Sequence, residues 1–151
     1  MRVYLPAVAS DLAAPDGISA RPAHAVTPGL RAASPGESEE DLELPAFLDA
    51  ATASLARLRA DDAPVRVVVA ADVDAAPPVP GGGITAVAAP AVPWSAVVSF
   101  HVDDPDDADG IAAVRAAVGG DAGAADIADE LDLLWYDASE RTALQARLEA
   151  L

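Results

Sequence analysis

The residues best suited to chemistry lie in the segment 95–104, where an apolar run ends in His101 and Asp103. If this segment is a strand, both side chains share one face. A histidine beside a carboxylate can transfer protons near neutral pH or bind a divalent cation. The alternative is an ordinary strand end followed by a solvated acidic turn.

Asp72 is a candidate third ligand, because it ends another apolar run at residues 65–71. Functional groups often sit at strand ends in parallel sheets. Carboxylates at a strand end also simply stop strand pairing. Asp72 therefore joins His101 and Asp103 in one site only if the two strand ends lie together.

Four further residues are candidates for binding rather than catalysis. Trp135 and Tyr136 are adjacent in an apolar run, so a strand would place one in the core and leave the other to contact a partner. The alternative for the second is a partly buried structural aromatic. Arg2 and Tyr4 lie on the polar side of an expected first strand and could bind an anion or a partner, or form an ordinary exposed face.

The elements that position these residues are strands interspersed with helices. Apolar patterns bounded by turn-forming residues predict strands at 2–5, 23–27, 65–71, 84–89, 97–103 and 131–136. The run at 65–71 is apolar on both faces, which is typical of a central strand. In the segment with His101, the residues Val98, Phe100 and Val102 are expected to face the core, and Pro6 is expected to end the first strand.

Helical spacing is clearest after Ser38, a residue suited to capping a helix over 39–59. Its expected apolar stripe consists of Leu44, Leu48, Ala51, Leu55 and Leu58, and Pro45 should kink the helix or begin its main segment. Shorter helices are expected near 10–12, at 111–118 and after Ser139, the last with a stripe of Leu144, Leu148 and Leu151. Residues 30–37 read as a loop, and 122–130 are ambiguous between helix and loop.

These elements predict an α+β or α/β fold, with a single mixed sheet of about five to six strands covered by helices. The 151 residues fit one domain, 1–151, with a surface loop rich in proline and glycine at about 72–83.

Composition excludes several classes of function. The chain has 25 acidic residues and only nine basic ones, for a net charge of −16, which disfavours nucleic acid and anionic membranes as partners. There is no cysteine for a catalytic thiol or a thiolate metal site. No apolar run approaches the roughly 18 residues of a membrane span, and the start lacks a secretory pattern, so we expect a cytoplasmic protein.

Five segments taken together carry a resemblance: MRVYLPA at 1–7, AVTP at 25–28, VVVAADV at 67–73, HVDD at 101–104 and LLWY at 133–136. In this order they resemble an uncharacterised family of small actinobacterial proteins, a domain of unknown function. The resemblance implies one compact domain in the bacterial cytosol. It brings no activity, cofactor or catalytic residue with it.

The sequence therefore leaves the function open and favours a non-catalytic interaction or accessory protein, with a protein partner or a second copy of itself. No cofactor and no catalytic set are identified. The alternative is a small metal-binding protein or metal-assisted hydrolase that uses His101 and Asp103. It requires that these residues and Asp72 converge.

Overall fold

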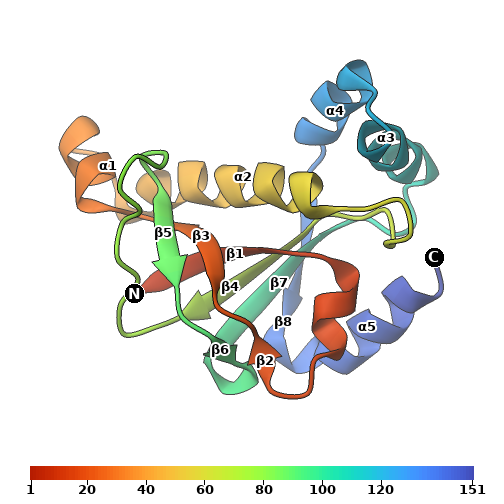
Figure 1. Cartoon of the computed structure of the whole chain (residues 1–151), viewed down its shortest axis with the longest axis horizontal. Coiled ribbons are helices and arrows are strands. Elements are labelled where there is room, and N and C mark those ends of the chain that lie inside the picture. Colours follow the sequence, from red (N-terminus) through yellow and green to blue (C-terminus); the bar gives the residue numbers. More distant parts are fainter.

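The computed structural model describes residues 1–151 and is built on a six-stranded sheet (Figure 1). Its strand order is β5-β3-β1-β4-β7-β8, and every neighbouring pair is antiparallel. The strands are β1 (Arg2–Ala7), β3 (Arg21–Ala25), β4 (Val67–Asp72), β5 (Ala86–Ala89), β7 (Val97–Asp103) and β8 (Leu133–Asp137). A separate two-stranded sheet pairs β2 (Gly17–Ile18) with β6 (Val92–Pro93).

Helices cover both faces of the main sheet. Figure 1 shows the long helix α2 (Glu39–Arg57) across one face, with α5 (Arg141–Glu149) and the short 3₁₀ helix η1 (Ala9–Ala13) on the other. The remaining helices are α1 (Pro28–Ala33), α3 (Ala108–Val118) and α4 (Ala122–Asp129), with 3₁₀ turns η2 (Trp94–Ala96) and η3 (Ala138–Glu140). The predicted α+β or α/β class, with a sheet of about five to six strands covered by helices, is confirmed. The sheet is antiparallel throughout and not mixed, which makes the fold α+β, and the β2–β6 pair forms a second sheet, because local strand patterns do not set strand direction.

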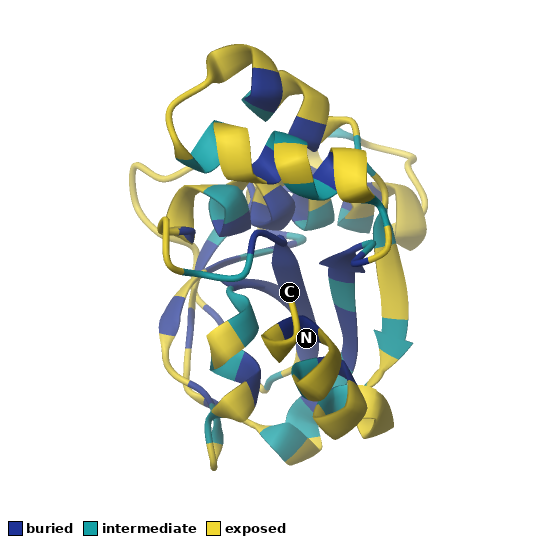
Figure 2. Ribbon diagram, turned by 90° about the vertical axis from the view of Figure 1, so that its right-hand side faces the viewer, coloured by how far each residue is buried: buried dark blue, intermediate teal, exposed yellow.

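The main sheet separates a large core cluster from a small one, because side chains alternate across the strands. A third cluster contains Leu58, Val114 and Ala128, from the end of α2 and from α3 and α4. Opposite α2, the large cluster contains Val3, Leu5 and Phe100, all fully buried. Under α2, the small cluster packs Tyr4 and the alanine-rich side of the helix against the sheet. Each fully buried Val, Leu or Phe contributes about 1.5–3 kcal/mol. Figure 2 shows the inner strands buried and an outer strand exposed.

Helix α2 begins as expected, since the Ser38 side chain accepts a hydrogen bond from the Asp41 amide at 3.1 Å. The expected stripe is confirmed at Ala51 and Leu58, which are buried, but is wrong at Leu44 and Leu48, which are 55% and 50% exposed. The buried side is instead formed by Leu42 and by small residues, Ala46, Ala50, Ala51 and Ser54. Small side chains let the helix backbone approach the sheet closely, and that packing outweighed the leucine spacing. Pro45 lies inside the helix and does not begin it.

Two predictions about prolines and loops were wrong near the start of the chain. β1 continues through Pro6, which pairs with Val68 of β4. Its missing amide is tolerated because pairing with β3 reaches only Tyr4, and the Pro6 carbonyl accepts a hydrogen bond from Arg21 at 3.0 Å. Residues 30–33, part of the loop expected at 30–37, belong instead to α1, since Thr27 caps the Leu30 amide.

Smaller corrections concern β7 and the last helix. The β4–β7 register shifts between Ala70 and Ala71, so that Val97 enters the core and Val98 is only half-buried. Asp137, not Ser139, provides the capping side chain before α5. In that helix Leu144 and Leu148 are buried as expected, whereas Leu151 is 40% exposed.

Candidate functional site

Asp103 is a structural residue. Its side chain is buried, and its carboxylate accepts hydrogen bonds from Arg66 Nη2 and from the Arg66 backbone amide, each at 2.7 Å. Arg66 is equally buried and donates also to the Leu131 carbonyl at 3.1 Å. The Asp103 oxygens are thus occupied by a guanidinium, which leaves them poorly suited to a metal ion.

Asp72 lies far from His101. Val68 is the β4 residue paired with His101, and Asp72 follows four residues later, about 13 Å along the strand. Asp72 instead accepts a hydrogen bond from Arg2 Nε at 2.8 Å. The Arg2 guanidinium holds the pKa of this carboxyl below its usual value, mainly through that hydrogen bond. His101, Asp103 and Asp72 therefore do not converge, and the structure contains no group of three His, Asp or Glu side chains that could hold a metal ion.

The predicted residues that do come together are Tyr4, His101 and Trp135, all on the α2 face of the sheet. His101 is the strand partner of Trp135, so the two side chains are neighbours. Phe47 of α2 packs edge-on against both Tyr4 and His101, with ring centroids 5.9 Å and 4.9 Å apart. This cluster lies where α2 stops covering the sheet.

A groove runs between the first half of α2 and the β7–β8 side of the sheet, and we call it the α2–β8 groove. Its volume is about 450 Å³. It is lined by aromatic, apolar and acidic side chains: Tyr4, Glu40, Asp41, Glu43, Leu44, Phe47, His101 and Leu133. Three of the eight are carboxylates and none is a permanent cation. The Arg2 guanidinium acts on both Tyr4 and His101 and offsets part of this negative charge.

Two titratable groups of the groove, His101 and Tyr4, have pKa values shifted in the directions that favour their neutral forms. Burial, and then the nearby Arg2 charge, lower the pKa of His101, which favours the neutral imidazole. Burial and the Glu43 carboxylate raise the pKa of Tyr4 to about 12. The His101 ring is held through Nε2 by the Ser99 hydroxyl at 3.0 Å, and Ser99 is buried. The arrangement is a polar and aromatic surface on which the neutral forms of His101 and Tyr4 are favoured.

Trp135 and Tyr136 divide as strand alternation predicts. Tyr136 is half-buried and packs against the large core cluster, whereas Trp135 is 61% exposed. Leu134 is 41% exposed on the face opposite Trp135. The edge strand β8 therefore presents large apolar side chains on both of its faces.

Sequence reasoning did not select Glu43, Phe47 or Leu133 as site residues. The signal was present in part, since Phe47 is one of only two phenylalanines and Glu43 belongs to an acidic run. What the sequence could not provide was the distance between that run and His101. Glu43 and Phe47 lie near His101 because α2 packs on the sheet with these two residues toward β7.

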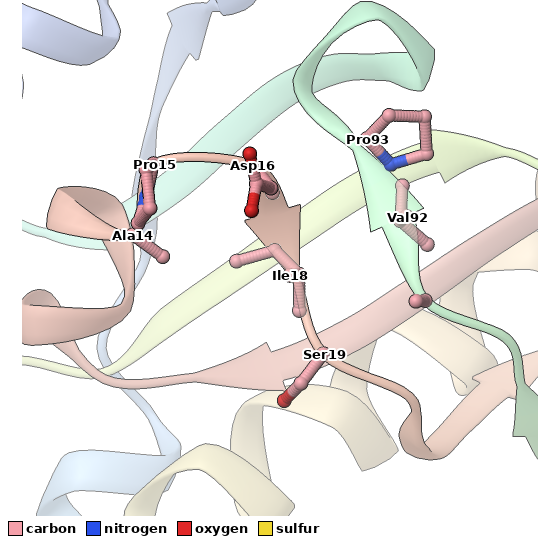
Figure 3. A pocket seen from close by; sticks show the side chains of 9 residues that line it. Ala14, Pro15, Asp16, Ile18, Ser19, Val92 and Pro93 are labelled. Atoms are coloured by element: carbon pink, nitrogen blue, oxygen red, sulfur yellow. The ribbon is translucent and has the colours of Figure 1, made fainter.

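A second pocket, of about 430 Å³, lies beside the small β2–β6 sheet (Figure 3). Its lining includes Pro15, Ile18, Val92 and Pro93, and its one charged residue is Asp16. Figure 3 shows these side chains around a shallow hollow with little polar chemistry. It is a weaker candidate than the α2–β8 groove.

No helix of the structure has both the length and the apolar character needed to cross a bilayer.

The comparisons with known proteins agree with the resemblance to a family of unknown function noted above. No curated protein and no solved structure matches the chain. A model of a family of unknown function, DUF6912, matches residues 1–144. The chain therefore belongs to the DUF6912 family of unknown function.

Proposed function

We propose that this protein is a non-catalytic interaction protein of the cytoplasm, and that it binds a protein partner through β8. We call the binding surface the β8 surface, consisting of Leu133, Leu134, Trp135 and the adjoining α2–β8 groove. The observation that carries the proposal is the 61% exposure of Trp135 on a strand of the sheet. A tryptophan held on a rigid element adds a large contact area at little entropic cost, and tryptophan is enriched among residues that dominate binding energy.

The chemistry of the groove supports recognition over catalysis. His101 and Tyr4 have pKa values displaced away from neutrality, in directions that keep both side chains uncharged. Ser99, the hydroxyl that contacts His101, is 3% exposed, so a substrate has little access to it. The net charge of −16 favours a protein partner over nucleic acid.

The proposal is tested by site-specific photo-crosslinking in the cells that make the protein. Benzoylphenylalanine is introduced in place of Trp135, and in place of Ile127, a matched control that is 55% exposed on α4. We expect a discrete crosslinked product at position 135 that excess unmodified protein competes away, and none at 127. Identical patterns at the two positions, or no product at 135, would overturn the proposal. So would substrate turnover that His101→Ala abolishes.

A further inference from the structure

The two edges of the main sheet differ in protection. The outer edge of β5 is covered by the chain that precedes it: the Val79 amide donates to the Ala86 carbonyl at 3.1 Å, and the Ala88 amide donates to the Pro77 carbonyl at 2.9 Å. β8, at the opposite edge, has no neighbour beyond it. Figure 1 shows the two strands at the two ends of the sheet.

The backbone of β8 presents unpaired groups on that open side. The Asp137 amide donates to the Glu140 carboxylate at 2.7 Å, so it points away from β7. In an antiparallel strand alternate residues point their N–H and C=O groups the same way. Leu133 and Trp135 share the parity of Asp137, and their backbone groups therefore face outward. They form a template for one more strand.

β8 lacks the devices that usually prevent such pairing. It contains no proline, no lysine and no bulge in its pairing with β7. Its only charged residue is Asp137, at its end, and Asp132 immediately precedes it. Both are exposed. These two carboxylates repel an added strand only if that strand carries negative charge.

Carboxylates near β8 select the occupant. On the α2 face lie the groove carboxylates, with Glu40 and Glu43 among them. On the other face burial and then the Asp104 carboxylate raise the pKa of Tyr136, whereas Arg147, which pairs with Asp106, lowers it. A second copy would bring another chain with a net charge of −16 to this edge, and repulsion between the two like-charged chains disfavours pairing of two copies.

We infer that β8 binds an extended, basic segment of a partner protein as a seventh strand of the sheet. The inference rests on the proposed function and specifies its partner. Alternate side chains of the added strand would lie on the α2 face beside Leu133 and Trp135. A lysine or arginine there can stack on the Trp135 ring while its charge approaches Asp137, an exposed carboxylate on the same face of β8.

The test uses the intact protein labelled with ¹⁵N and a capped peptide of about seven residues that alternates valine with lysine or arginine. We expect the peptide to bind and to slow amide exchange at Leu133 and Trp135. N-methylation of the peptide amides that face β8 should weaken binding about tenfold or more. A peptide with glutamate in place of the basic residues should not bind.

Variants of the protein complete the experiment. Trp135→Ala should weaken peptide binding, and Ile127→Ala, equally exposed but on α4, should not. No binding of the basic peptide, or equal binding of its N-methylated form, would overturn the inference. So would protection of Leu133 and Trp135 without peptide, growing with protein concentration, since it indicates self-pairing. If one of these results overturns the inference, the proposed function still holds provided that the crosslink at position 135 forms and is competed away by unmodified protein. If that crosslink is absent, the proposed function and the inference are both overturned.

Discussion

Arg66 and Asp103 form a buried ion pair between the start of β4 and the end of β7. The Arg66 guanidinium donates to both Asp103 oxygens, at 2.7 Å from Nη2 and 3.0 Å from Nε. Side-chain exposure is 2% for Arg66 and 3% for Asp103. The pair also ties the strands to Leu131, just before β8. It therefore holds the scaffold on which the β8 surface is built.

Removing one partner of this pair should be strongly destabilising. Asp103→Ala leaves the Arg66 charge buried without compensation, so the free energy of unfolding should fall by about 3–5 kcal/mol. The measurement is urea unfolding followed by circular dichroism. Replacing both residues with apolar ones, in the double variant R66M/D103L, should recover only part of the loss, because the backbone amide of residue 66, which donates to Asp103 at 2.7 Å, stays without a partner. A loss below about 1 kcal/mol for Asp103→Ala would contradict the buried pair.

Ser54 should be similarly important for joining α2 to the sheet. Its hydroxyl is fully buried, donates to the Ala7 carbonyl at 2.7 Å and accepts from the Val67 amide at 2.8 Å. Ser54→Ala leaves both backbone groups without a partner, and should lower the free energy of unfolding by about 2 kcal/mol or more. Ser139→Ala, which changes an exposed hydroxyl, is the control for chemical denaturation. Equal midpoints for the two variants would contradict this role.

Trp135 should matter for binding and not for stability. Because the side chain is 61% exposed, Trp135→Ala should change the free energy of unfolding by no more than about 0.5 kcal/mol. The other tryptophan, Trp94, is half-buried, and its Nε1 donates to the Ala14 carbonyl at 2.8 Å. Acrylamide should therefore quench wild-type fluorescence more efficiently than that of Trp135→Ala. Equal quenching in the two proteins would show that Trp135 is covered.

The histidines should make stability fall under mildly acidic conditions. Burial lowers the pKa of both His24 and His101 below the unfolded value near 6.5, so between the two values the unfolded chain binds more protons. Stability present above about pH 6.5 is then lost progressively as the pH falls toward the folded-state pKa values. Arg2 contributes to this shift at His101, and Asp49 opposes it at His24.

The measurement for the histidines is urea unfolding at pH values between about 7.5 and 5.5, above the range where most carboxylates titrate. His101→Gln should show a weaker pH dependence than the wild type over this window. A steeper pH dependence for His101→Gln, or stability that rises as the pH falls, would contradict the lowered pKa values of the histidines. NMR titration of the two rings gives the pKa values directly.

Local patterns determined the elements of this protein, and in several places their faces. Alternation identified Phe100 and Val102 as core residues, and apolar character on both faces identified β4 as central, because both follow from short-range backbone geometry. The split of Trp135 from Tyr136 was predictable for the same reason. Composition also determined the negative net charge of the protein, which favours a positively charged partner.

The tertiary structure decided which of those residues meet. Asp103 looked like a ligand beside His101 until Arg66, 37 positions earlier, was found against it. Asp72 and His101 are separated by the antiparallel β4–β7 register, and Glu43 and Phe47 approach His101 only through the packing of α2. Such contacts depend on strand order and helix placement, which a single sequence does not encode in any local pattern. The sequence determined the strand that carries Trp135, and only the fold made that strand an open edge beside an acidic groove.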